Sequence, residues 1–283
     1  MGYMQELNQF KEHLQIQEKS DATVEKYLRD AAAFLRFAGD RELSKEVAVE
    51  YKKQLQQYYT LRSVNSMLAS INSYFSFLGR EDCRLRNLRC QQQIYCPEEK
   101  ELTKQEYIRL LRAARSNRKL YLILQTICAT GIRVSELPYF TVEALHAGSI
   151  TVRCKSKSRT VLVPGKLKSQ LLAYGKEMGI VSGPVFVSRE GKPVNRSQIW
   201  RQMKQLCRAA MVSRSKVFPH NLRKLFAKTF YAMEKDIAKL ADLLGHSSIN
   251  TTRIYIMSTG TDHLRKMERL GLIFSPGKIK RVT

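Results

Sequence analysis

The stretch Leu243-Leu-Gly-His-Ser-Ser-Ile-Asn-Thr-Thr-Arg-Ile-Tyr255 decides how this chain folds around its most reactive residues. Its leucines close a helical pattern, and Gly245 suits the left-handed cap that ends such a helix. The two serines after His246 can cap a second, short helix that carries Tyr255 nine positions further on. The stretch therefore predicts two helices joined by a tight turn, presenting an imidazole and a phenol.

Two earlier strings add a second imidazole and two guanidiniums: Ala-Thr-Gly-Ile-Arg-Val-Ser-Glu-Leu (129–137) and His-Asn-Leu-Arg-Lys (220–224). Glu136 follows Arg133 by three residues, a spacing at which side chains on one helical face meet, so the carboxylate can orient the guanidinium. A proline directly before His220 favours a helix start there. Arg223 then shares a face with His220 near the positive end of that helix, where an anion is favoured.

These residue types are the ones that cleavage of a phosphodiester by a protein nucleophile requires. Arg133 and Arg223 can hold the non-bridging oxygens of a phosphate. His220 and His246 can move protons near neutral pH, and Tyr255 can form a covalent phosphoester. Taken singly, each has a plainer structural explanation, such as an Arg–Glu pair, a surface histidine or a half-buried tyrosine. The ordered set indicates a functional site.

The charge distribution points to a polyanionic partner. The chain has 49 Lys+Arg and 25 Asp+Glu, a formal charge of +24. Residues 1–84 contain 12 of each sign, which leaves 37 basic and 13 acidic residues for positions 85–283. A polyanion fits this excess, because each neutralised phosphate releases condensed counterions and strengthens binding. A basic surface that merely keeps the protein soluble is the alternative.

Other classes of protein are disfavoured by what the sequence does not contain. The six cysteines show no C-x-x-C pairing, which argues against a zinc site or a disulfide framework and favours reduced thiols. No carboxylate cluster suits two catalytic metals, so we expect no metal and no other cofactor. No apolar run approaches the roughly 18 residues that span a bilayer, and the N-terminus lacks signal-peptide features. We expect a cytoplasmic, nucleoid-associated protein without a membrane partner.

The periodicity predicts two domains. Four helical patterns make residues 1–84 a bundle. Residues 85–101 have the composition of a linker. In and beside this linker lie Arg84, Arg86 and Arg89, which we expect to contact a DNA backbone. A capping box at Thr103-Lys-Gln-Glu106 opens a second domain, residues 102–273, and 274–283 form a flexible basic tail. Within the second domain, 149–154 and 160–164 alternate like a hairpin with its tip at 155–159.

With these strings in this order, the chain resembles the tyrosine recombinases, the family of phage and transposon integrases and of Xer-type recombinases. The resemblance covers nearly the whole length, and Leu-Leu-Gly-His-x-x-x-x-Thr-Thr-x-x-Tyr is among the family's most specific motifs. It implies a mainly α fold with a small β-sheet. It also implies a two-domain clamp on duplex DNA, in which an N-terminal helical, SAM-like core-binding bundle joins a mixed α/β catalytic domain.

The resemblance also implies residue roles. Arg133 and Arg223 would clamp the scissile phosphate, His220 would transfer a proton, His246 would support the phosphate and Tyr255 would be the nucleophile. The family's hairpin lysine protonates the leaving 5′-oxygen. Where relatives commonly show Lys-Gly-x-Lys or Lys-Gly-Lys, this chain has Lys155-Ser-Lys157, so Lys155 is preferred and Lys157 is the rival. DNA contacts are expected from Lys157, from Arg159 and from Lys224, which stands where many relatives carry histidine.

The implied reaction gives a 3′-phosphotyrosyl link and a free 5′-hydroxyl, and exchanges strands through a four-way junction without a nucleotide cofactor. The implied partners are a double-stranded recombination site and a homotetramer on DNA, with a monomer or weak dimer when free. A C-terminal helix within 262–272 would dock into a neighbouring protomer, and packing in cis is the alternative.

Integration of a mobile element is favoured, because the hairpin and tail sequences depart from the commonest Xer-like pattern. Xer-type chromosome or plasmid dimer resolution is the main alternative. A type IB topoisomerase, a telomere resolvase and a non-catalytic DNA-binding regulator on the same fold are the others.

Overall fold

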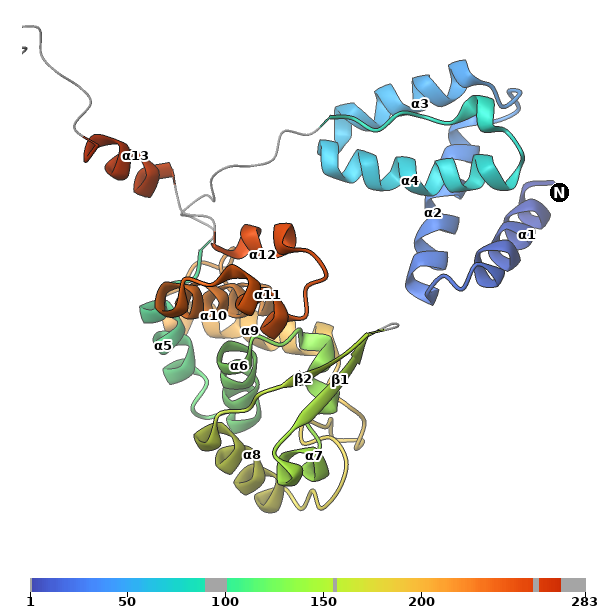
Figure 1. The fold of residues 1–283 in the computed structure, drawn as a ribbon. Coiled ribbons are helices and arrows are strands. Elements are labelled where there is room, and N and C mark those ends of the chain that lie inside the picture. Colours follow the sequence, from blue (N-terminus) through green and yellow to red (C-terminus); the bar gives the residue numbers. More distant parts are fainter. Residues whose placement is uncertain (1, 90–100, 155–156, 257–259, 271–283) are drawn as a thin grey trace, which may run out of the picture. The chain divides into compact units, whose positions relative to one another are not determined.

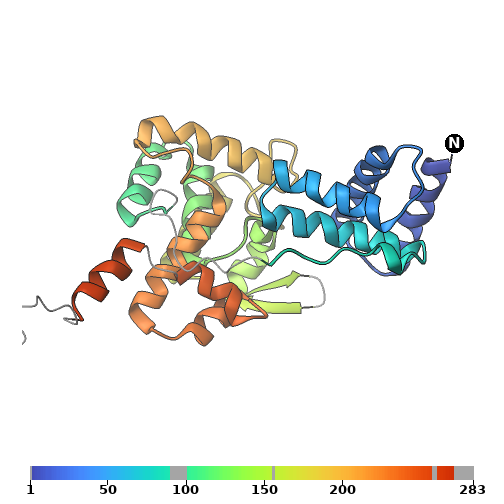
Figure 2. The same ribbon diagram turned by 90° about the horizontal axis from the view of Figure 1, so that it is seen from above.

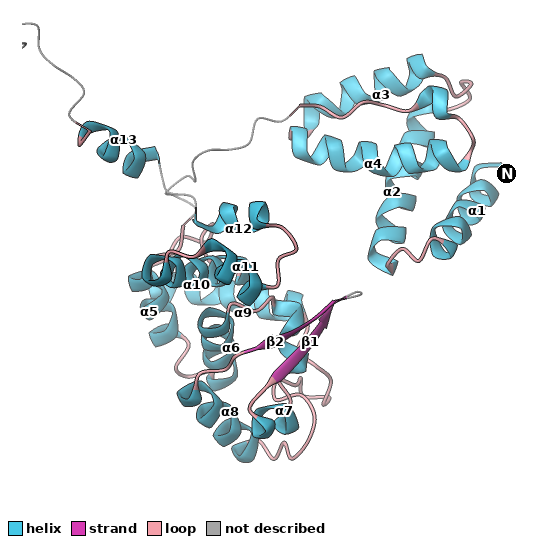
Figure 3. Cartoon of the chain, viewed as in Figure 1, coloured by secondary structure: helices cyan, strands magenta, loops and turns pink. Residues whose placement is uncertain are grey.

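The computed structural model describes residues 2–89, 101–154, 157–256 and 260–270. The chain divides into two compact units, Met1–Gln92 and Gln93–Thr283 (Figure 1). The described residues are mainly helical and contain one two-stranded sheet (Figure 3). This confirms the predicted combination of helices with a small sheet. No helix among the described residues has both the length and the apolar content needed to cross a membrane.

The first unit is the predicted helical bundle. Its elements are α1 (Gly2–Ile16), α2 (Asp21–Ala38), α3 (Lys45–Tyr58), α4 (Leu61–Phe77) and the 3-10 turn η1 (Glu81–Cys83). Ser44 and Thr60 cap α3 and α4 by accepting backbone N–H groups of their first turns. The apolar stripes of the four helices meet in a core that includes Phe10, Phe34 and Phe75, each fully buried.

An extended segment after η1 is fastened to this bundle by two asparagines. The Asn72 amide donates to the Leu85 carbonyl and accepts the Leu85 N–H, both at 2.8 Å. Asn65 does the same for Leu88, at 2.9 and 2.7 Å. Residues 85–89, which the sequence assigned to a linker, therefore pack on the bundle. Residues 90–100 lie outside the described ranges. Arg84, Arg86 and Arg89 are all exposed on this segment, as is Asn87.

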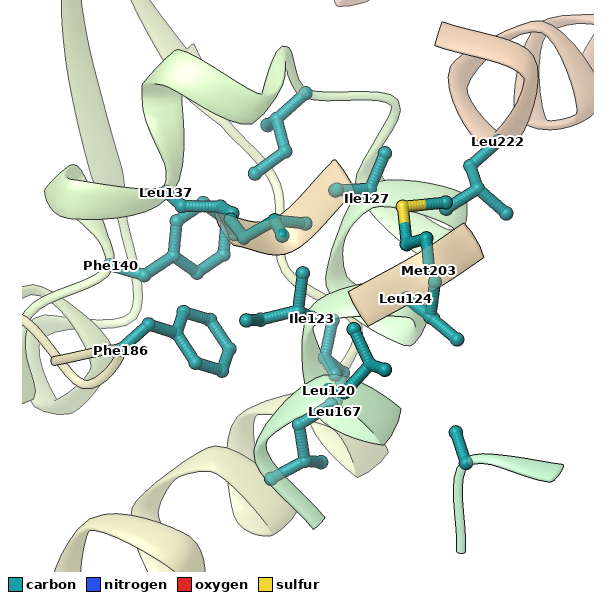
Figure 4. Close-up of a cluster of buried hydrophobic side chains, with 14 of the residues drawn as sticks. Leu120, Ile123, Leu124, Ile127, Leu137, Phe140, Leu167, Phe186, Met203 and Leu222 are labelled. Carbon is teal, nitrogen blue, oxygen red and sulfur yellow. The ribbon is translucent and has the colours of Figure 1, made fainter. Parts of the chain in front are cut away.

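The second unit is built around a buried central helix. Its helical elements are α5 (Lys104–Ala113), α6 (Arg118–Thr130), η3 (Val134–Tyr139), α7 (Val142–Ala147), α8 (Gly165–Glu177), α9 (Arg196–Ala210), α10 (Pro219–Glu234), α11 (Ile237–Leu244), α12 (Ile249–Ile256) and α13 (Gly260–Glu268). Figure 4 shows Ile123 and Ile127 of α6 between Phe140 and Phe186 on one side and Met203 of α9 on the other. The predicted capping box forms at Thr103 and Glu106.

The C-terminal part of this unit carries the motif that opened the sequence analysis. α10, α11 and α12 pack on one another and appear side by side in both ribbon views (Figures 1 and 2). Gly245 ends α11 in the left-handed region, with φ +64°, as the sequence predicted. The predicted tail, 274–283, lies outside the described residues.

The hairpin differs from its prediction at both ends of its second strand: the strand predicted over 160–164 starts earlier and already ends at Val161. β1 (Ile150–Cys154) pairs antiparallel with β2 (Lys157–Val161), and Val152 lies opposite Arg159. The second strand therefore begins at residue 157, and the prediction that 155–159 form the tip was wrong for its last three residues. The reason is that pairing with β1, a contact between separate segments, extends the strand. Since residues two apart in a strand share a face, Arg159 lies on the same face as the buried Val161.

Candidate active site

Arg223 lies at the centre of the site and is only 1% exposed. α10 carries it between the ends of two other helices. Its Nη1 donates to the Gly131 carbonyl at the end of α6, and its Nη2 donates to the Leu244 carbonyl at the end of α11, at 2.7 Å. These carbonyls lie where helices leave acceptors unsatisfied and carry partial negative charge, so a guanidinium suits them. The Nε atom is buried without a hydrogen-bond partner among the described residues.

His246 is held from both sides. Its Nε2 lies 2.8 Å from Nη2 of Arg223, and its Nδ1 lies 2.9 Å from Oγ1 of Thr252. Thr252 is fully buried in α12. The histidine therefore connects the Arg223 guanidinium to the helix that carries Tyr255.

Tyr255 lies against the two histidines of the site, in the same chain. Its ring centroid is 5.1 Å from that of His220 and 5.2 Å from that of His246. The Arg223 guanidinium carbon lies 5.9 Å from the centre of the same ring. The tyrosine is 6% exposed and also packs with apolar residues of α10 and α11. The three strings chosen from the sequence are thus brought together within one chain.

Arg133 belongs to a second, adjoining network. Its backbone N–H donates to Oε2 of Glu136 at 2.8 Å, and its Nη1 donates to Oε1 at 3.1 Å. Glu136 is buried and also accepts from Nη2 of Arg159 at 2.7 Å. The Arg133 side chain is 40% exposed. The predicted orienting contact between Glu136 and Arg133 is therefore present, while the guanidinium keeps access to solvent.

The site is strongly positive, and the titration of its groups reflects this. Burial, with Arg133 next, lowers the pKa of Arg223 to about 10. Partial burial of the ring, followed by the charge of Arg223, lowers the pKa of His220. The same two causes lower the pKa of His246 to about 4. Both imidazoles are therefore neutral at pH 7, mainly through burial, and the nearby positive charges that also lower their pKa values favour an anion such as a phosphate.

A cavity of about 700 Å³ adjoins these groups. Arg133, His220 and Arg223 form one wall. α9 supplies another wall with Arg196, Trp200 and Arg201, which the sequence analysis did not single out. The signal was available for Arg196 and Trp200, because a basic and an aromatic side chain four positions apart share one helical face. The hollow combines the predicted site with further cationic and aromatic surface.

Other predicted residues lie differently. Lys155 is outside the described residues, and Lys157 begins β2 with a side chain that is not described. Lys224 is 13% exposed and donates to Glu101 at 3.0 Å. Arg159 is 14% exposed and bound within the protein. Among the described residues, no group of three or more His, Cys, Asp or Glu is placed to hold a metal ion.

Comparisons with known proteins identify the family. Residues 100–261 match the Phage integrase family, and residues 7–82 match the Phage integrase N-terminal SAM-like domain. Tyrosine recombinase XerA of Thermococcus kodakarensis is 30% identical over 273 residues, covering 93% of each chain. XerA of Pyrococcus furiosus is 29% identical and covers 94% of each chain.

Solved structures share the fold. The crystal structure of XerA recombinase is 26% identical, covers 96% of this chain and 99% of its own, and has a TM-score of 0.53. A lambda integrase(75–356) dimer bound to a COC′ core site reaches a TM-score of 0.74 at 16% identity, covering 100% of both chains. The chain belongs to the phage integrase family. This confirms the resemblance drawn from the motifs and the enzyme class, a tyrosine-type site-specific DNA recombinase.

Proposed function

We propose that Tyr255 attacks a backbone phosphate of duplex DNA and forms a 3′-phosphotyrosyl link, releasing a 5′-hydroxyl. A single observation supports this most strongly: the phenol lies in contact with His220, His246 and Arg223 of its own chain. A nucleophile, two neutral proton carriers and an arginine thus share one place. Reversal of the attack by a 5′-hydroxyl of a partner duplex exchanges strands through a four-way junction.

Arg133 and Arg223 hold the non-bridging oxygens of the phosphate and stabilise the charge that develops in the transition state. The partly exposed guanidinium of Arg133 can donate to it, and so can the Nε of Arg223, which has no partner among the described residues. His220 accepts the phenolic proton, since its lowered pKa keeps it in the basic form at neutral pH. His246 supports the phosphate. Lys155, with Lys157 as the rival, protonates the departing 5′-oxygen.

The two halves of the clamp would be the bundle, residues 1–84, and the catalytic domain, residues 102–273. DNA is the substrate of solved neighbours, including a lambda integrase tetramer bound to a Holliday junction. We extend this to a homotetramer on DNA for the present chain, with a monomer or weak dimer when free.

Two apolar surfaces of the catalytic unit could join the subunits of such a tetramer. α13 exposes Leu264 and Met267, and Leu270, two residues beyond its end, is exposed as well; the three recur at helical spacing. The catalytic unit also has an apolar hollow of about 290 Å³ between α5, α6 and α10. Its lining includes Ile108, Phe230 and Met233. Docking of α13 from one subunit into this hollow of the next would link the active sites of a tetramer.

Integration of a mobile element remains the biological role that we propose. A transposon integrase, that of Tn1549 with its transposon right-end DNA, shares the fold at 16% identity and a TM-score of 0.68. The second candidate is dimer resolution of the Xer type, which the names of the curated relatives favour.

Covalent capture on genomic DNA tests the reaction and the role together. Genomic DNA of the source organism, nicked at random, is incubated with wild-type protein or Tyr255→Phe, denatured with detergent, and passed through a protein-binding filter. Wild-type protein retains DNA and the variant does not. Retained ends that flank the coding region indicate integration, whereas one distant chromosomal site indicates dimer resolution. Retention by neither protein supports the non-catalytic regulator and contradicts the proposal.

A further inference from the structure

Arg159 was predicted to contact DNA, and in the structure its guanidinium is bound within the protein. It lies on the inward face of β2 and its side chain is 14% exposed. Its guanidinium donates through Nη2 to Glu136 at 2.7 Å and through Nη1 to the Leu243 carbonyl at 2.8 Å. One side chain of the hairpin therefore ties η3 to the end of α11, across 23 and 84 residues of sequence.

Both arginines proposed to hold the phosphate are fixed to that same helix end. Arg223 donates to the carbonyl of Leu244. Arg133 is held by Glu136, which Arg159 binds while donating to the carbonyl of Leu243. Two guanidiniums thus bind consecutive carbonyls at the end of α11. Through these contacts, the last turn of the helix sets where Arg133 stands relative to Arg223.

The side chain of Arg159 also passes close to Gly245. A Cβ at Gly245 would lie 2.3 Å from Cδ of Arg159. The arginine stem therefore occupies the space beside the glycine that precedes His246. The planar fork of arginine donates along two fixed directions, whereas lysine offers one compact charge on a flexible stem. Only arginine can serve Glu136 and Leu243 together from this strand.

We propose that Arg159 is a positioning residue, which fixes the Arg133–Glu136 pair to the end of α11 and so sets the geometry of the two phosphate-binding arginines. The proposal rests on the proposed function of this site, because it assigns a role in the cleavage step. It predicts that loss of the Arg159 guanidinium slows cleavage without weakening DNA binding.

The test compares Arg159→Lys and Arg159→Met with Arg153→Met, an exposed arginine of the neighbouring strand. The probe is a nicked duplex of the sequence retained by the filter. The measurements are the single-turnover rate of adduct formation at saturating DNA, the Kd for the same duplex at fixed salt, and the thermal midpoint. Both Arg159 variants should lose about tenfold to a hundredfold in rate with Kd within about twofold. Arg153→Met should keep the wild-type rate and weaken Kd modestly.

Arg159→Lys decides the matter if Arg159→Met fails to fold, since it keeps the charge. A wild-type rate for Arg159→Lys overturns the proposal, and so does a pattern in which the Arg159 variants lose only affinity, as Arg153→Met does. Failure of the wild-type protein to form any adduct is a different result, which removes the proposed function and this inference with it.

Discussion

Nη2 of Arg223 lies 2.8 Å from Nε2 of His246, and this contact determines which nitrogen of the histidine carries the proton. A guanidinium can only donate hydrogen bonds, so Nε2 must accept. The proton of the neutral ring is then on Nδ1, which donates to Oγ1 of Thr252 at 2.9 Å. His246 is therefore neutral in the DNA-free protein, and its ring orientation is set from both sides.

Acid should destabilise the protein by charging His246. Its pKa is lowered to about 4 by burial and by Arg223, whereas a histidine of the unfolded chain titrates near 6.5. The unfolded state binds more protons between these values, so the free energy of unfolding falls as the pH falls from about 6.5 to about 4. We expect this residue to account for about 2 kcal/mol between pH 7 and pH 5.

The measurement is urea unfolding at both pH values for wild type and His246→Gln. The variant keeps a polar side chain but does not titrate, and the carboxylates contribute equally to both proteins. A smaller loss for the variant is expected. An equal loss would show that His246 is not the titrating group.

Thr252→Val should impair cleavage through His246. The substitution keeps the shape of the buried side chain but leaves the Nδ1–H without its acceptor, which costs about 1–3 kcal/mol. We expect the adduct-forming rate to fall about tenfold at unchanged DNA affinity. Thr251→Val, at the exposed neighbouring position, is the control and should behave as wild type. Equal rates for the two variants would argue against the assigned proton position.

Glu136→Gln should be costly because the carboxylate is buried and serves both Arg133 and Arg159. Neutralising it leaves two guanidiniums with a weaker acceptor, and we expect a loss of about 3 kcal/mol in the free energy of unfolding. Glu177→Gln removes an Arg–Glu pair that is about half exposed, and should cost less than about 1 kcal/mol. Chemical denaturation of both variants gives the comparison, and similar losses would contradict the account.

Gly245→Ala should disturb Arg159 beyond the strain of the backbone. An L-residue at positive φ costs about 1–2 kcal/mol wherever it stands. Gly179→Ala, at φ +67° with open space around it, measures that cost alone. At Gly245 the added methyl group must also displace the arginine stem, so we expect a further loss of about 2 kcal/mol. Equal shifts of the thermal midpoint for the two variants would mean that the Arg159 side chain moves aside without loss of stability.

Local signals were sufficient for much of this structure. The capping box at Thr103, the left-handed cap at Gly245 and the Arg133–Glu136 contact depend on residues within four positions of one another. The sequence predicted each of them for that reason. The convergence of the three strings was implied by the family resemblance and is present in the fold.

Contacts between distant segments were not predictable in the same way. Arg159 reads as an exposed cation at a hairpin tip, and only pairing with β1 shows that it points inward. Lys224 looked available for DNA, but Glu101, more than a hundred residues earlier, binds it. In both cases, a charged side chain is satisfied by a partner that the local pattern does not reveal.

Peptide mapping of the covalent adduct tests the central claim most directly. Trypsin cleavage after Arg253 and Arg265 yields a peptide in which Tyr255 is the only tyrosine. After nuclease trimming of wild-type adduct, mass spectrometry should find this peptide carrying a nucleotide through its 3′-phosphate. A nucleotide on any other residue, or a link through a 5′-phosphate, would contradict the assignment of Tyr255 as the nucleophile.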